Sequence, residues 1–191
     1  MPRSALYDWL LGKKAGAVAL VLLTLACVYL FVFRGTRFFM VPSGSMEPTL
    51  MPSDMLVTMR EPAYRRGDIV VLRHNGEYLV KRIVGLGGDS LMVVDGALFI
   101  NGKYASEPYV REPMRYAIDS PVAVPGDGVF FLGDNRNQSD DSSLPKESWD
   151  AKYYYDLASV SDIVGRVVFR YYPYDRWGPV ASYPLTNSDG A

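Results

Sequence analysis

The chain has 191 residues, of which 49% are hydrophobic, and 20 Lys and Arg against 21 Asp and Glu give a formal net charge of −1. This composition excludes intrinsic disorder as the general state, and the balanced charge offers no basic surface for nucleic acid. The single cysteine, Cys27, and the single histidine, His74, exclude an intramolecular disulfide and a Cys- or His-rich metal site. We therefore expect no metal and no cofactor.

The first 39 residues differ from the rest in charge and hydropathy. They hold five of the basic residues but only one acidic residue, Asp8, so the remainder is net acidic. Residues 15–33 form a run of 19 residues without a charge. A helix of that length measures about 28 Å, close to the roughly 30 Å hydrocarbon layer of a bilayer.

We predict one transmembrane helix at 15–33, a cytoplasmic N-terminus at 1–14 and an extracytoplasmic domain at 34–191 on a single-pass protein of the cytoplasmic membrane. The alternative is a cleaved signal peptide, but the run is long for one and bulky residues follow it where a small-residue cleavage site would stand. The basic residues on either side of the run are nearly balanced. The inside orientation therefore rests mainly on the shortness of the N-terminus.

The remainder of the chain is typical of a mainly β domain. Short runs of β-branched and aromatic residues alternate with turn residues, and Asn75-Gly76 and Asp95-Gly96 indicate two hairpins. Prolines argue against central strands between 101 and 125, and 141–161 suggests a loop with a helical turn. The predicted strands are 55–58, 68–73, 78–85, 91–94, 97–100, 128–132 and 163–172.

Lys81 is the candidate general base. Alternation along the strand at 78–85 places it on one face between Leu79 and Ile83. Burial there disfavours the charged ammonium and lowers its pKa, as a lysine base requires. The alternative is an ordinary strand lysine whose amine reaches solvent. His74 is a weaker candidate, because it sits at a hairpin turn where side chains are usually solvated.

A candidate nucleophile lies in the segment 41–50, which reads VPSGSMEPTL. Its prolines and glycine favour a tight path that can hold a hydroxyl outward and aim backbone N–H groups at one point, as an oxyanion hole needs. A plain juxtamembrane linker is the alternative. A third polar cluster, GDNRNQSDDS at 133–142, follows an apolar strand. It is either a surface turn or a hydrogen-bonding scaffold for a buried lysine, and its acidic residues lack the spacing of a calcium loop.

Together these segments resemble the bacterial type I signal peptidases, which are membrane-anchored Ser-Lys endopeptidases. Residues 42–50 are similar to the serine box of that family, 66–71 (RGDIVV) to its strand box, 81–89 (KRIVGLGGD) to its lysine box and 133–142 to its last box. The four boxes occur in order over most of the chain. Ser143 stands where the family usually has arginine, so the ion pair of that arginine with Asp141 is absent or replaced.

The resemblance implies a fold of coiled antiparallel β-sheets behind one transmembrane helix, and it implies a role for each matching residue. Ser45 is the nucleophile and Lys81 the general base. The Ser45 amide and the Ser43 hydroxyl form the oxyanion hole. Ser139 orients Lys81, and Asp141 supports that network.

The implied function is removal of signal peptides from exported preproteins after small-x-small motifs such as Ala-x-Ala, by a serine endopeptidase that works at the lipid bilayer near the secretion translocon. The substrate adds as a strand beside the segments that lead into Ser45 and Lys81. Two alternatives stay open at this point. One is a dedicated processing peptidase of pilin or conjugation type with the same chemistry, and the other is a non-catalytic β binding module on a membrane anchor.

Overall fold

The computed structural model describes residues 3–33, 35–147 and 153–185. The chain divides into two compact units, residues 1–36 and 37–191. The parts of the predicted N-terminus and catalytic domain at 1–2, 34, 148–152 and 186–191 lie outside the described residues. Each unit is described by itself.

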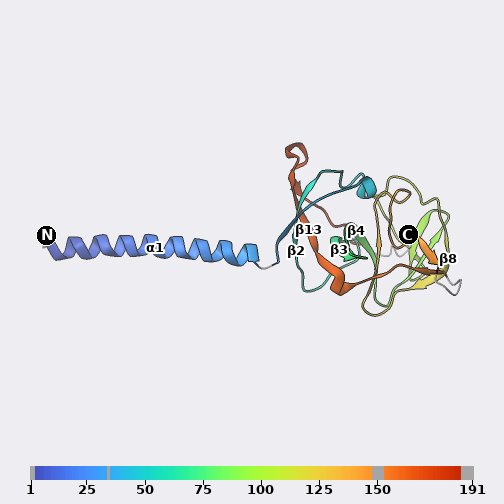
Figure 1. The fold of residues 1–191 in the computed structure, drawn as a ribbon, viewed down its shortest axis with the longest axis horizontal. Coiled ribbons are helices and arrows are strands. Elements are labelled where there is room, and N and C mark those ends of the chain that lie inside the picture. Colours follow the sequence, from blue (N-terminus) through green and yellow to red (C-terminus); the bar gives the residue numbers. More distant parts are fainter. Residues whose placement is uncertain (1–2, 34, 148–152, 186–191) are drawn as a thin grey trace. The chain divides into compact units, whose positions relative to one another are not determined.

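The first unit is one continuous helix, α1 (Arg3–Phe33), at the blue end of the chain in Figure 1. Its side chains are described from 13 to 29, so the predicted span at 15–33 runs four residues beyond them. In the part of the chain that is described, no helix combines the length and the apolar character that crossing a membrane takes. The described apolar side chains of α1, including Leu20 and Leu23, are exposed.

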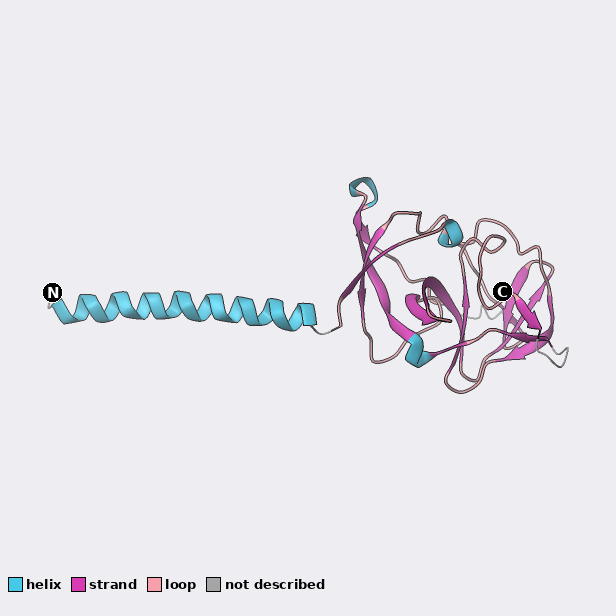
Figure 2. Ribbon diagram, viewed as in Figure 1, coloured by secondary structure: helices cyan, strands magenta, loops and turns pink. Residues whose placement is uncertain are grey.

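The second unit is built almost wholly of strands, drawn in magenta in Figure 2, with three single-turn 3₁₀ helices. The prediction of a mainly β domain with antiparallel sheets is thus confirmed. The strands are β1 (Arg37–Met40), β2 (Met55–Met59), β3 (Ile69–His74), β4 (Glu77–Leu86), β5 (Ser90–Val94), β6 (Ala97–Ile100), β7 (Lys103–Tyr104), β8 (Ile118–Ala123), β9 (Gly128–Leu132), β10 (Pro145–Glu147), β11 (Tyr153–Tyr155), β12 (Ala158–Ser159), β13 (Ile163–Tyr172) and β14 (Gly178–Pro179). The 3₁₀ helices are η1 (Gly44–Met46), η2 (Val160–Asp162) and η3 (Tyr174–Arg176).

The largest sheet has eight strands. Seven follow one another in the order β1-β2-β13-β3-β4-β9-β12, and β14 pairs with β13. The pairings are antiparallel, and the long strand β13 crosses the middle of the sheet beside β2 and β3 (Figure 1). A second sheet has the order β7-β6-β5-β8, and β10 and β11 form a small separate pair.

The predicted hairpin turns have the backbone that their sequences require. Asn75 and Gly76 have φ angles of 50° and 87°, and Asp95 and Gly96 have 49° and 76°. Both central residues of a type I′ turn need positive φ, which Asn, Asp and Gly accept at low cost. The first of these turns joins β3 to β4 with His74 opposite Glu77, and this pairing fixes the register that places Lys81 opposite Val70.

Of two segments with unusual composition, the first agrees with the sequence prediction and the second differs from it. The stretch 101–125 contains β7 and β8, both at the edges of their sheet, where Pro121 in β8 does not interrupt a central ladder. The stretch 141–161, predicted as a loop with a helical turn, contains η2 but also β10, β11 and β12. The three tyrosines of β11 pair with β10, and strands of two or three residues are too short for an alternating pattern to reveal them.

The apolar core explains why both faces of β3 and β4 are buried. Ile69 and Val71 on one face of β3 join a cluster with Met46 and Leu50, and Val70 and Leu72 on the other face join a second cluster. A third cluster lies around the second sheet and includes Phe130 and Leu132 of β9. The centre of β4 is therefore surrounded by protein on both sides.

Candidate active site

Ser45 is the middle residue of the single-turn 3₁₀ helix η1, which begins directly after the extended residue Ser43. The turn is closed by the Glu47 amide, which donates to the Gly44 carbonyl at 3.1 Å, and it is fixed in place by the fully buried side chain of Met46. Ser45 itself is half-buried. The Ser43 hydroxyl donates toward the Ser45 hydroxyl across 3.4 Å, so the two oxygens predicted to act together lie side by side.

Lys81 is buried at the centre of β4, with only 3% of its surface exposed. Its neighbours along the strand, Leu79 and Ile83, pack in the same apolar cluster, as the alternation predicted. Burial lowers the pKa of Lys81 below its ordinary value of 10.5, and the carboxylates of Asp141 and Asp140 partly oppose that shift. The sequence-based expectation of a desolvated amine is confirmed.

The amine of Lys81 donates a hydrogen bond to the Ser139 hydroxyl at 2.8 Å. Ser139 lies in the polar loop that follows β9, 58 residues away along the chain. A buried amine has few partners to choose from, so this contact limits the rotamers that the four-carbon side chain can adopt. The predicted neighbour of Lys81 is therefore in hydrogen-bonding position.

Gly133 joins the serine turn to the lysine network. A Cβ atom built on Gly133 would overlap with the Ser139 side chain and also with the carbonyl oxygen of Ser45. Both groups thus lie against the same point of the chain, where only glycine fits. Asn135 strengthens the junction, because its amide donates to the Ser45 carbonyl at 3.0 Å and its side chain donates to the Gly44 carbonyl at 3.1 Å.

Asp141 organises the loop beneath Lys81. One of its carboxylate oxygens accepts from the Gly133 amide at 2.8 Å, and the other accepts from both the amide and the hydroxyl of Ser143, at 3.0 and 2.7 Å. Hydrogen bonds from Ser143 thus occupy Asp141 where the resemblance led us to expect an arginine or a gap. Among the described residues the Asp141 carboxylate forms no salt bridge, and it raises the pKa of Lys81 against the effect of burial.

A buried ion pair holds the same loop from its other end. Asp134 accepts two hydrogen bonds from Arg82, at 2.8 and 2.6 Å, and a third from the Thr49 hydroxyl at 2.6 Å. Arg82 also donates to the Gly67 carbonyl and stacks 3.8 Å above the ring of Tyr109. All of these positions except Tyr109 lie inside the four boxes, but their pairing could not be inferred from a single sequence.

His74 corrects the expectation of a solvated turn histidine. It ends β3 with 13% of its side chain exposed, and its imidazole lies 2.9 Å from the carboxylate of Asp156 and edge-on to Phe131. The segment that carries Asp156 returns to cover it, which the hairpin sequence alone could not predict. No hydrogen bond joins His74 to Ser45 or Lys81 among the described residues.

The arrangement brings together a serine hydroxyl on a tight turn, a second hydroxyl beside it, and a buried amine whose pKa burial has lowered. This set of groups defines a candidate hydrolase site of the Ser-Lys kind, in which an uncharged lysine rather than a histidine serves as base. Comparison with known proteins is consistent with this class.

The family model "Signal peptidase, peptidase S26" matches residues 12–172. The chain is 36% identical to "Signal peptidase I P" of Bacillus subtilis subsp. natto, over 91% of this chain and 93% of that protein. It is 30% identical to "Probable signal peptidase I-1" of Synechocystis sp., over 92% of this chain and 90% of that protein. A crystal structure of a signal peptidase I from Enterococcus faecalis aligns with a TM-score of 0.44 and 28% identity, covering 55% of this chain and 96% of that one.

The chain belongs to the signal peptidase family, peptidase S26. It is accordingly a serine protease, a hydrolase of the signal peptidase I group.

Proposed function

We propose that this protein removes N-terminal signal peptides from exported preproteins, cutting after small-x-small motifs such as Ala-x-Ala, with Ser45 as nucleophile and Lys81 as general base. Its similarity to signal peptidases I supports the removal of signal peptides. One observation carries the assignment of residues. The amine of Lys81 is nearly fully buried, burial lowers its pKa, and its partner Ser139 lies against Gly133, which also contacts the Ser45 turn.

The reaction proceeds in two halves. The uncharged amine of Lys81 takes the Ser45 hydroxyl proton while the oxygen bonds to the scissile carbonyl carbon, whose π electrons move to its oxygen. The oxyanion is stabilised by the Ser45 amide and the Ser43 hydroxyl. The intermediate then collapses, the C–N bond breaks, and the ammonium of Lys81 protonates the leaving amine. Water attacks the resulting ester, Lys81 takes its proton, and Ser45 leaves with that proton restored.

Ser139 and Asp141 serve this reaction through Lys81. Ser139 accepts the hydrogen bond that fixes the lysine rotamer, and Asp141 holds the Gly133 amide and hence the junction of the two segments. The substrate adds as an extended strand beside residues 41–43 and the segment leading into Lys81, with alternate small side chains in shallow pockets.

The same proposal places the protein in the cytoplasmic membrane, with its N-terminus inside, its catalytic unit on the extracytoplasmic face and the secretion translocon nearby. It assigns residues 15–33 as the anchor, because they carry no charge and the described apolar side chains of that helix are exposed. Ser45 follows Phe33 by twelve positions in the chain, so the serine lies within about 40 Å of the end of the anchor even if the linker is extended. A precursor whose apolar segment lies in the same bilayer presents its cleavage site at a similar distance from the membrane.

A cleavage assay tests the proposal. The purified full chain in detergent is incubated with a peptide that contains an apolar segment followed by Ala-x-Ala, and the products are identified by mass spectrometry. We expect one cut after the second Ala, absent in Ser45→Ala and in Lys81→Ala, with Ser106→Ala, an exposed loop serine, as the control that keeps activity. Cleavage that survives either substitution contradicts the assigned pair. Cleavage of only a few among many precursors points instead to a dedicated processing peptidase, and no cleavage of any precursor to a binding module.

A further inference from the structure

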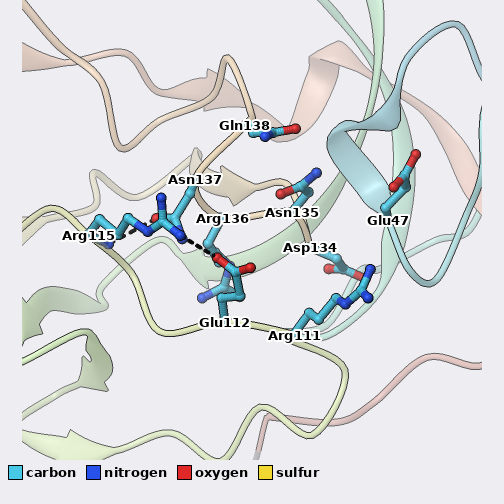
Figure 3. A pocket seen from close by; sticks show the side chains of 9 residues that line it. All are labelled: Glu47, Arg111, Glu112, Arg115, Asp134, Asn135, Arg136, Asn137 and Gln138. Atoms are coloured by element: carbon cyan, nitrogen blue, oxygen red, sulfur yellow. Dashed lines mark hydrogen bonds and ion pairs between the residues drawn. The ribbon is translucent and has the colours of Figure 1, made fainter.

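A pocket of about 240 Å³ lies beside the serine turn and is shown in Figure 3. It is formed by three segments: Glu47 just after Ser45, the loop 111–115, and the loop 134–138 that follows β9. Its lining is polar, with six charged side chains, and none of it comes from residues 41–44 or from β4. We call it the loop pocket.

The position of the loop pocket places it near the part of the substrate that follows the scissile bond. In the proposed function the residues before the cut lie beside 41–43 and the segment leading into Lys81. Neither segment lines the loop pocket, whereas Glu47 is two residues beyond the nucleophile and Asn135 binds the carbonyls of Gly44 and Ser45. A substrate strand that passes Ser45 in the direction of Glu47 would therefore reach the loop pocket with the residues that follow the cut.

The walls of the pocket are fixed before any substrate arrives. Buried Arg136 bonds the Glu107 carboxylate through two nitrogens, at 2.6 and 2.5 Å, and donates to the Gly133 carbonyl at 3.1 Å. The Arg115 amide donates to the Asn137 side chain at 2.9 Å, and Asn137 donates in return to the Pro113 carbonyl at 3.1 Å. The loop 111–115 is thus tied to the catalytic loop at several points.

The charges of the pocket are mostly neutralised by partners. Asp134 pairs with Arg82, Arg136 with Glu107, and Arg115 with Glu112. Within the described part of the chain, Arg111 and Glu47 are the two charged lining residues without an oppositely charged partner. They project from different loops in Figure 3, so the pocket presents one unused cation and one unused anion.

We propose that the loop pocket binds the residues of the precursor that follow the scissile bond, and that Arg111 selects an acidic side chain among them; this inference rests on the proposed function. A guanidinium presents a planar set of donors that fits a carboxylate with two parallel hydrogen bonds. Glu47, on the neighbouring segment, repels a second acid. A precursor with one Asp or Glu shortly after the cut is therefore the preferred substrate.

The test compares peptides that differ at one position after the cut. A parent peptide with uncharged residues at positions 2 to 4 of the mature part is compared with versions that carry Asp, Asn or Lys at each of those positions, and kcat/KM is measured for each. We expect Asp to be preferred over Asn by about fivefold at one of these positions, as for a partly exposed charge-assisted pair. The preference should shrink at high salt, because Arg111 is exposed.

Substitutions at Arg111 decide the assignment. Arg111→Gln should abolish the Asp preference, and Arg111→Glu should reverse it in favour of Lys. Arg60→Gln makes the same charge change at an exposed residue outside the pocket and should keep the preference. An unchanged preference in Arg111→Gln, or no preference in the wild type, overturns this inference alone. A parent peptide that is not cut in a Ser45-dependent way overturns the proposed function and this inference with it.

Discussion

The amine of Lys81 and the hydroxyl of Ser139 lie 2.8 Å apart, and this contact links the centre of β4 to the loop after β9. Because Lys81 is nearly fully buried, Ser139 is a major constraint on where its amine can point. The proposed reaction needs that amine aimed at the Ser45 hydroxyl.

Replacing Ser139 by Ala should therefore lower kcat by about 10- to 100-fold, less than the roughly 10²- to 10⁴-fold that an acid-base group itself contributes, with little change in KM. Steady-state kinetics on the Ala-x-Ala peptide measure the effect. Ser120→Ala, at an exposed position of β8, provides the matched control. Equal losses in the two variants, or a change confined to KM, contradict a role for Ser139 in orienting Lys81.

The pH dependence of the reaction should report the charge around Lys81. Only the uncharged amine acts as base, so kcat/KM rises with pH through the lowered pKa of Lys81. Asp140 is exposed and its carboxylate raises that pKa. Asp140→Asn removes the charge, so we expect the acid limb of the pH profile to move to lower pH. Asp119→Asn, at an exposed position of β8, should leave the limb in place; an upward shift in Asp140→Asn refutes the argument.

Burial of Lys81 should also cost stability. Its pKa in the folded chain is lowered, so between that pKa and 10.5 the unfolded chain binds more protons, and stability rises with pH. Lys81→Met removes the ammonium and keeps most of the volume. We expect the variant to unfold at a higher denaturant midpoint than wild type at pH 6, with the gap narrowing toward pH 10. A gap that widens with pH contradicts this assignment.

For the buried ion pair of Arg82 and Asp134 we expect the opposite effect on stability, because removing one charge leaves the other without its partner. Asp134→Ala leaves an uncompensated guanidinium inside the protein, which should lower the free energy of unfolding by about 3–5 kcal/mol. The double variant Arg82→Met with Asp134→Leu removes both charges and should be markedly more stable than the single variant. Denaturant melts of the three proteins measure the difference. A double variant as unstable as the single one shows that the charge itself is not the cause.

The sequence allowed prediction of those strands and turns that are determined by residues close together in the chain. The alternation of Leu79, Lys81 and Ile83 and the Asn75-Gly76 turn have local physical reasons, and the structure agrees with both. The pairings of Arg82 with Asp134 and of His74 with Asp156 join residues 52 and 82 positions apart, and no periodicity encodes such contacts. The strands β10 and β11 were missed for a similar reason, because each is only three residues long and depends on the other.

The site residues were found unevenly. Ser45, Lys81, Ser43, Ser139 and Asp141 came from matching boxes, and their roles remain proposals. Gly133 and Asn135 stood in the last box without a role. The requirement for glycine at 133 becomes visible only in the structure, where the Ser45 turn and the Ser139 side chain both contact that residue.

The contact at Gly133 has one more consequence. The Ser45 carbonyl and the Ser139 side chain both lie against Gly133. A methyl group at that position would force the two apart, although the Ser45 and Lys81 side chains would be chemically unchanged. Alignment of the proposed nucleophile with the proposed base thus depends on the absence of a side chain at Gly133. A larger side chain at this point would push the Ser45 turn away from Ser139, and with it from the amine of Lys81.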